Sequence, residues 1–419
     1  MGLWLLVPEH LRLGTWDLLC GWTQQPGPTV APRLALQMVH EAALCITGIR
    51  QQRCLGHRGF ELANGLPFVA TDQAIHELLN VHTMLQAEEL QVALGRMRHA
   101  SGHYAGRLLA LDPHRMVSHT QRRTRVRRPS AKAPPTKTIQ AFFCLDADTR
   151  EPVCCTLGTS GPTVAQATPH LLDLAAAILP QGGRRALALA DCEHFTADLI
   201  EQVHPRGRFD LVVPMPNQPY VQKRLRTIPA QAFIPRWAGL ATAKVPFRFQ
   251  HGAGVPLHLF AQRSGERPQE YRFKGFLGTA DSDEVQTLTT EFPKRWHIEE
   301  FFNTHQALGW ERAGTHNLHI RYGRMTMALL AEAAISQLRR RLPQTLADWD
   351  ATHFAREVLA GLDGGIKVHE DTIVVTYHNA EQMRPLADEL EGLPNRLERE
   401  GVDPRVPWLY GLKLDFRFR

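Results

Sequence analysis

The chain has 419 residues, of which 43% are hydrophobic, so it is long enough for two or three domains with a buried core. Lys and Arg outnumber Asp and Glu by 48 to 42, a balance that suits a polyanionic partner only mildly, and no stretch reaches the roughly 20 apolar residues that span a bilayer. The seven cysteines include no Cys-x-x-Cys pair, so we expect no zinc site, no disulfide framework and a reduced, cytoplasmic protein.

Residues 1–105 are predicted to be mainly helical. Residues 33–48 have an amphipathic pattern, and Thr71 is a predicted N-cap before an apolar-periodic run that continues to about Met97. No helix-turn-helix signature stands out in this region. A ligand-binding region and a helical packing platform therefore both remain open.

Residues 106–215 are predicted to combine strands and helices. An apolar run at 108–111 ends at Asp112, where Pro113 should stop the strand, and a second run at 185–190 leads into Asp191. Further strands are expected at 139–145, 152–157 and 209–214, and helices at 163–179 and 195–203. Mixed strands followed by alternating strands and helices indicate an α/β fold around one sheet.

Asp112 and Asp191 are candidate functional residues because each follows an apolar, strand-like run. Sheets covered by helices on both faces place their working groups just past the strand ends. A single Asp in such a place is more often a helix cap or a turn former. Asp146 and Asp148 are alternative candidates, but they lie in a predicted hairpin turn, and turn chemistry is the better interpretation for both.

The segment from His114 to Lys137 contains no acidic residue and concentrates positive charge. Its cations are Arg115, Arg122, Arg123, Arg125, Arg127, Arg128, Lys132 and Lys137. Because the segment directly follows the first strand, we expect it at the mouth of a site, where its contacts with phosphates would be sequence-independent and salt-sensitive. A solvated loop or linker is the alternative interpretation.

Residues 216–282 contain short alternating segments that predict a β-rich insertion. Trp237 lies there near Lys244, Arg248 and Arg263, and either a pocket for an anionic ligand or an ordinary small β core would explain these residues.

The segment that starts at Phe292 is predicted to be the start of a helix. Arg295 and Glu299 lie four residues apart, which places both on one helical face, and apolar neighbours indicate that the helix is half buried. A carboxylate beside an arginine on a buried helix is costly unless something uses it, although an ordinary helix-face ion pair is the alternative. Glu300 is the rival acid, but its register points away from Arg295.

The remaining residues are predicted to form a buried helix at 322–342, a helix at 348–359, a hairpin near 366–377, a charged helix at 380–400 and a basic, alternating tail. The sequence does not tell whether this α+β region dimerises, binds DNA or covers the core.

The order of these features resembles the DDE transposases of bacterial insertion sequences, in the group with a Tyr-Arg-Glu-Lys signature. The signature places Arg three residues after Tyr, Glu four after Arg and Lys seven after Glu, and those positions hold Phe292, Arg295, Glu299 and Gln306. The resemblance spans about residues 108–338. Phe292 lacks the Tyr hydroxyl and Gln306 replaces the Lys that contacts DNA, a contact for which Lys294 or His305 could substitute.

The resemblance implies a ribonuclease H-like mixed sheet flanked by helices. Its parts would be a helical N-terminal region at 1–105 with DNA binding as one role, a catalytic core at 106–215 and 283–345, a β-rich insertion at 216–282 and an α+β C-terminal region at 346–419.

The resemblance also implies an active site. Asp112, Asp191 and Glu299 would hold two Mg²⁺ ions, or Mn²⁺ in their place, with Asp112 contacting both ions. The DNA-binding residues would be Arg295, Arg122, Arg123, Arg125, Arg127, Arg128, Lys294, Trp237 and Gln306.

The implied reaction is cleavage of DNA at transposon ends followed by strand transfer into target DNA. A homodimer on double-stranded DNA and a cytoplasmic, nucleoid-associated place in a bacterium are the further expectations. Two alternatives stay open: a ribonuclease H-like nuclease without strand transfer, and a decayed or domesticated transposase that only binds DNA.

Overall fold

The structure is a computed structural model that describes residues 1–25, 29–46, 59–68, 70–118, 126–127, 134–158, 163–180, 183, 185–252, 254–310, 315–378 and 380–419. The chain folds into two compact units. Unit 1 comprises Met1–Ser101, Met116–Ser118 and Phe302–Arg419, and unit 2 comprises Gly102–Arg115 and His119–Phe301.

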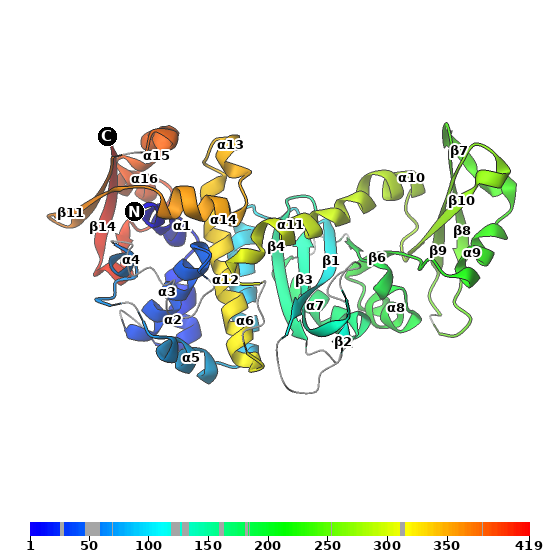
Figure 1. The fold of residues 1–419 in the computed structure, drawn as a ribbon, viewed down its shortest axis with the longest axis horizontal. Coiled ribbons are helices and arrows are strands. Elements are labelled where there is room, and N and C mark those ends of the chain that lie inside the picture. The colour runs from blue at the N-terminus through cyan, green and yellow to red at the C-terminus, as the bar shows by residue number, and fades with distance from the viewer. Residues whose placement is uncertain are drawn as a thin grey trace. The chain divides into compact units, whose positions relative to one another are not determined.

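A mixed sheet organises unit 2, and its described part has ten strands (Figure 1). The order is β2-β3-β1-β5-β6-β10-β9-β8-β7, and β4 also pairs with β3. The strands are β1 (Leu108–Val117), β2 (Val126–Arg127), β3 (Thr136–Asp146), β4 (Glu151–Gly158), β5 (Ala186–Leu189), β6 (Phe209–Pro214), β7 (Ile234–Trp237), β8 (Leu240–Phe247), β9 (Leu257–Ser264) and β10 (Arg272–Gly278). β5 pairs parallel with β1 on one side and parallel with β6 on the other, whereas β3 pairs antiparallel with β4.

Helices flank the sheet and account for its apolar strands. Unit 2 contains α7 (Val164–Ile178), η2 (Cys192–His194), α8 (Ala197–Val203), η3 (His204–Arg206), α9 (Pro219–Arg226), η4 (Ala230–Ala232), η5 (Pro268–Glu270), α10 (Glu284–Gln286), η6 (Thr287–Glu291), η7 (Phe292–Trp296) and α11 (His297–His305). α7 packs on β3 and β4. The fully buried stretch Leu108, Leu109, Ala110 and Leu111 matches a strand covered on both faces, so the predicted mixed sheet flanked by helices is confirmed.

The first strand differs from its prediction. β1 continues through Asp112 and Pro113 to Val117, so Asp112 lies within the strand and not at its end. The parallel pairing with β5 stops at Ala110 opposite Leu189. Pro113 lies beyond that paired stretch, and its missing N–H therefore removes no bond to β5.

The helix that carries Glu299 also starts elsewhere than predicted. Helical structure begins at α10, where the Asp283 side chain caps the Gln286 N–H, and not at Phe292. It continues through the π-helical η6 and the 3-10 turn η7 before α11 becomes regular. Pro293 has no N–H to donate, which breaks the regular α-helical hydrogen-bond pattern at this point.

The insertion is an antiparallel extension of the sheet made of β7–β10, as the alternating sequence predicted. β10 pairs with β6 and so joins the insertion to the core. α9 was not predicted. It approaches β10 so closely that a Cβ at Gly275 would lie 2.8 Å from Met215 and 2.9 Å from Leu225.

The long helix α12 (Leu318–Arg339) organises unit 1, where it packs against α3, α5 and α6 (Figure 1). Arg98 and Glu332 form a buried ion pair at 2.7 Å between α6 and α12. The other helical elements are η1 (Gly2–Leu6), α1 (Val7–Arg12), α2 (Thr15–Thr23), α3 (Val30–Ala43), α4 (Phe60–Ala63), α5 (Asp72–Val81), α6 (Met84–Ala100), η8 (Gln306–Leu308), α13 (Gln344–Ala347), α14 (Ala351–Phe354), η9 (Ala355–Ala360), η10 (Glu381–Leu386), α15 (Ala387–Leu390), α16 (Leu393–Arg399) and η11 (Pro407–Leu409).

Two predicted helices of unit 1 are interrupted. The run from Thr71 is divided at His82, which has an extended backbone, and Thr83 caps α6 with a capping box. The charged segment at 380–400 forms three short helices. The backbone is extended at Glu391 and left-handed at Gly392, which separates α15 from α16, and Pro394 lies in the first turn of α16.

Unit 1 also contains a second sheet, whose strand order is β11-β12-β14-β13. Its strands are β11 (Gly364–His369), β12 (Thr372–Tyr377), β13 (Arg405–Val406) and β14 (Leu412–Phe418). β11 and β12 form the predicted hairpin. Buried Trp408 donates its indole N–H to the Ala63 carbonyl at 2.9 Å and so ties the tail to α4.

Among the described residues, no helix has the length and apolar character needed to cross a membrane. Of the described cysteines, Cys144 carries a buried free thiol and Cys192 an exposed one.

Candidate active site

Three acids from distant parts of the sequence approach one arginine in unit 2. Asp112 lies in β1, Asp191 follows β5, and Glu299 lies in α11. The Arg295 guanidinium donates to Asp112 Oδ1 at 3.5 Å and to Glu299 Oε1 at 2.5 Å. The negative charge of Asp191 raises the pKa of Asp112, and the positive charge of Arg295 lowers the pKa of Asp191, so Asp191 lies close to both residues. The four residues that the sequence singled out therefore form one cluster.

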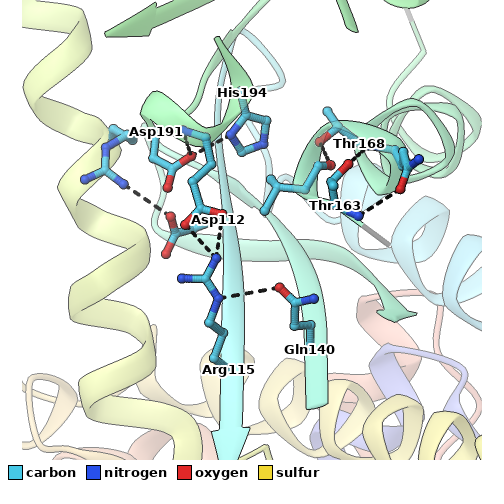
Figure 2. Close-up of polar contacts among 11 residues, drawn as sticks. Asp112, Arg115, Gln140, Thr163, Thr168, Asp191 and His194 are labelled. Atoms are coloured by element: carbon cyan, nitrogen blue, oxygen red, sulfur yellow. Dashed lines mark hydrogen bonds and ion pairs between the residues drawn. The ribbon is translucent and has the colours of Figure 1, made fainter. Parts of the chain in front are cut away.

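Asp191 is held by its own loop. As the N-cap of η2, its Oδ1 accepts the Glu193 N–H at 3.0 Å and His194 Nδ1 at 2.7 Å. Figure 2 shows this contact with the buried His194, and Asp112 beside it. Burial alone would raise the pKa of Asp191, but the hydrogen bond and charge of His194, the Glu193 N–H and Arg295 together lower it.

For Asp112, the effects that raise the pKa outweigh those that lower it. Burial, followed by the negative charges of Asp191 and Glu299, raises the pKa of Asp112 to about 8, although Arg295 and Arg115 oppose the rise. One guanidinium thus neutralises only part of the charge of three carboxylates. A site with this deficit of positive charge favours the binding of a further cation.

The donor set consists of carboxylate oxygens, which suit hard divalent ions such as Mg²⁺ or Mn²⁺. Among the described residues, however, no group of three or more His, Cys, Asp and Glu side chains is arranged to hold a metal ion. The Arg295 guanidinium contacts both Asp112 and Glu299. Shared metal coordination by these two acids would therefore require Arg295 to move away from them.

Arg115 and Glu193 join the two segments that carry the aspartates, a contact that sequence analysis missed. Arg115 donates to both carboxylate oxygens of Glu193 at 2.6 Å, and its Nε lies 3.5 Å from Gln140 Oε1 (Figure 2). Arg115 follows Asp112 by three residues and Glu193 follows Asp191 by two. No local pattern in the sequence links Arg115 to Glu193, because 78 positions separate them.

The rival acids are engaged elsewhere in unit 2. Glu300 is 47% exposed at its side chain and lies 3.7 Å from Arg150. Asp146 is fully buried and caps the β3–β4 turn by accepting the N–H groups of Asp148 and Thr149. Asp148 pairs with Arg107 and Lys294. Turn chemistry therefore accounts for Asp146, as the sequence indicated.

The predicted DNA-binding residues have different surroundings. Lys294 donates to Asp148 at 2.6 Å, whereas Trp237 is 53% exposed on β7. Gln306 starts η8 in unit 1, and the Phe292 ring packs on Phe276 with a 4.8 Å centroid distance. Arg122, Arg123, Arg125 and Arg128 lie outside the described residues, and only the backbone of Arg127 is described, in β2.

Comparison with known proteins provides a distant structural likeness. No protein-family model and no curated protein matches the chain significantly. Among solved structures, the chain is similar to a piggyBac transposase in a synaptic complex with hairpin DNA, with a TM-score of 0.40 and 11% identity over 84% of this chain and 79% of that one. At this level of similarity, functional assignment rests on the geometry of the site itself.

Proposed function

We propose that the protein is a DDE-type DNA transposase that cleaves DNA at transposon ends and transfers the freed strand into target DNA, with Asp112, Asp191 and Glu299 as its catalytic acids. The observation that carries this proposal is the meeting of three acids around Arg295, since each acid comes from a different element, β1, the end of β5 or α11. A partly buried cluster of three carboxylates is costly for the fold and is typical of a functional site.

Both steps of transposition are in-line displacements at phosphorus. A water molecule or a 3′ hydroxyl must lose its proton, and the leaving oxygen must be stabilised. Two divalent ions such as Mg²⁺ would supply both effects. Asp112, Asp191 and Glu299 would hold these ions through their carboxylate oxygens. Mn²⁺ offers similar chemistry to the same oxygen ligands.

Arg295 has two roles in this scheme. In the structure its guanidinium contacts Asp112 and Glu299. The planar donor geometry of a guanidinium also suits a DNA phosphate, so Arg295 would contact the backbone of the bound substrate.

The DNA partner would be held mainly through its backbone. The acid-free segment from His114 to Lys137 supplies cations directly after the strand that carries Asp112. Lys294, Trp237 and Gln306 are the other proposed contacts. Because two transposon ends must be brought together, we propose a homodimer on DNA. We also propose that the element is a bacterial insertion sequence and that the protein works on the nucleoid.

The test is incubation of the purified protein with Mg²⁺ and a plasmid that carries the gene with its native flanking DNA. Glu299→Gln is the test variant and Glu300→Gln the matched control, since the two acids are adjacent and only Glu299 contacts Arg295. We expect excised and joined products from the wild type and Glu300→Gln, none from Glu299→Gln, and unchanged DNA binding by all three.

Other outcomes identify the alternatives. Cut DNA without joined products would indicate a nuclease without strand transfer. Tight, salt-sensitive binding without cleavage would indicate a descendant that only binds DNA, and Phe292 and Gln306 would then be the first positions to restore to the signature. Loss of activity in Glu300→Gln alone would move the third catalytic role to Glu300.

A further inference from the structure

We infer that the β3–β4 turn, residues 146–150, positions the Glu299 helix against β1, with Asp148 and His297 as the positioning residues. This inference rests on the proposed function, because it explains how the third acid reaches the first. The turn contacts the start of β1 and also the irregular first part of the helix that carries Glu299.

The turn is fastened to β1. Asp146 Oδ2 accepts the Gly106 N–H at 2.7 Å, and the Ala147 N–H donates to the Leu108 carbonyl at 2.8 Å. Leu108 belongs to the stretch of β1 that pairs with β5, four residues before Asp112. The side chain of Asp146 is fully buried and holds the turn closed. The turn and Asp112 therefore share one rigid frame.

The same turn holds the helix next to Arg295. Asp148 Oδ1 accepts from Lys294 Nζ at 2.6 Å, and the Ala147 carbonyl accepts from His297 Nδ1 at 2.8 Å. The Asp148 side chain is only 16% exposed, so its ion pair is less screened than one in open solvent. These two contacts bracket Arg295 in sequence and precede Glu299 on the same helix.

Arg107 provides a third contact between this region and the helical segment. Arg107, just before β1, donates to Glu291 at 2.9 Å and to Asp148 at 3.2 Å. Glu291 ends the π-helical η6. The turn and its neighbour Arg107 thus contact the helical segment before and after Pro293.

External contacts matter here because the helix does not set its own register. η6 is π-helical and η7 is a 3-10 turn, so the pitch changes twice before Glu299. A change of one residue in helical register rotates a side chain by about 100°. Displacement of a catalytic group by about 1 Å can cost about 100-fold in rate. The contacts to Asp148 and Ala147 set the register that aims Glu299 at Arg295 and Asp112.

The test is Asp148→Asn, with Asp148→Glu as the conservative rescue and Asp173→Asn as the matched control. Asp173 is an exposed acid of α7 in the same unit and pairs with Arg206 at 3.4 Å. The first readout is Mn²⁺ binding to the DNA-free protein, followed by electron paramagnetic resonance. The second is the Mg²⁺ concentration that gives half-maximal DNA cleavage.

We expect Asp148→Asn to weaken Mn²⁺ binding and to raise the half-maximal Mg²⁺ concentration by about 10-fold, while DNA affinity stays unchanged, as is typical of residues that orient metal ligands. Asp148→Glu should recover most of the loss, and Asp173→Asn should show none. Lys294→Gln should weaken Mn²⁺ binding less than Asp148→Asn does, because Asp148→Asn also removes the pair with Arg107. The double variant should lose no more than Asp148→Asn alone, because the pair between Lys294 and Asp148 is already absent in that variant. This cycle separates positioning from a general loss of folding.

Wild-type Mn²⁺ binding and Mg²⁺ dependence in a folded Asp148→Asn variant would overturn the inference and leave the proposed function intact. A wild type that neither binds Mn²⁺ nor cleaves DNA would overturn the proposed function, and the inference with it.

Discussion

Arg295 donates to Asp112 at 3.5 Å although 183 positions separate the two residues in the sequence. The same guanidinium contacts Glu299, so one cation joins the first and third acids. The positive charge of Arg295 reduces the electrostatic repulsion between the acids of β1 and α11.

Arg295→Gln should therefore have two effects. DNA cleavage should fall by 100-fold or more, because the phosphate contact and the orientation of Glu299 are both lost. The melting temperature of the metal-free protein should also fall, by about 3 °C or more, since a partly buried charge pair loses one partner. Cleavage of flanking DNA and thermal unfolding measure the two effects. Arg150→Gln, which removes only the looser contact with Glu300, should leave both near wild type.

Asp112→Asn should stabilise the metal-free protein in a pH-dependent way. Because the pKa of Asp112 is raised from 3.8 to about 8, the folded state keeps a proton that the unfolded state releases across this range. Stability from this group therefore falls as pH rises from about 4 to 8, by up to about 1.4 kcal/mol per pH unit. The melting temperature of Asp112→Asn minus that of wild type should grow over this range.

Asp191→Asn provides the contrast, because the pKa of Asp191 is lowered. Its ionised form contributes stability above the unfolded pKa of 3.8, and this contribution is lost as pH falls through the folded pKa. Asp191→Asn should therefore lower the melting temperature at neutral pH. If both variants changed the melting temperature by the same amount in the same direction, the pKa values of the two aspartates would not be shifted in opposite directions.

The Arg115–Glu193 pair should act as a unit. Arg115→Gln and Glu193→Gln should each slow single-turnover cleavage by about 10-fold, because either change frees the Asp191 loop from β1. The double variant should be no slower than either single variant. Independent, multiplying losses would mean that the two side chains have separate roles, such as a direct contact between Arg115 and phosphate.

DNA affinity should depend on salt through the segment from His114 to Lys137. Replacing Arg122 and Arg123 with Gln should reduce the slope of log affinity against log salt by about 0.9 per lost phosphate contact. Arg396→Gln with Arg399→Gln is the charge-matched control, since both arginines project from α16 and donate to backbone carbonyls. Equal slope changes in the two double variants would show a response to net charge alone.

Unit 1 should lose stability in mild acid. His10 and His40 are buried, and their Nε2 atoms lie 3.2 Å apart. Burial lowers the pKa of His10 well below 6.5, and burial lowers the pKa of His40 to about 4. The folded state thus keeps both rings neutral while the unfolded state takes up protons below pH 6.5. Stability should therefore fall as pH drops from 6.5 towards 4.

His40→Gln should flatten this dependence, and His369→Gln on the exposed strand β11 is the control. Thermal unfolding between pH 4 and 7 measures the effect. An unchanged pH profile in His40→Gln would mean that other groups cause the acid sensitivity.

The predictable part of the site lay in short-range patterns. The four-residue spacing of Arg295 and Glu299 brings both to one helical face, as local geometry requires. Asp191 after a buried run was found at a strand end, where its side chain caps the next turn. The turn chemistry of Asp146 was equally local. In each of these contacts, the two residues lie within four positions of each other in the sequence.

The parts that were wrong or missed depend on distant partners. Asp112 sits inside β1 because the pairing with β5 ends before Pro113, and only the partner strand decides where a proline is tolerated. The pair between Lys294 and Asp148, 146 positions apart, had no local signal in the sequence. Arg115 and Glu193 carry no pattern that links them before folding.

By itself, the sequence singled out Asp112, Asp191, Glu299 and Arg295, because apolar runs precede the two aspartates and a four-residue spacing places the arginine and the glutamate on one helical face. Only the tertiary structure decided that Asp112 lies within its strand, that Arg295 lies between two of the acids, and that a hairpin turn supports the third. The physical reason is range: helix spacing and capping act over a few residues, whereas strand register and ion pairing depend on segments that meet only in the folded chain.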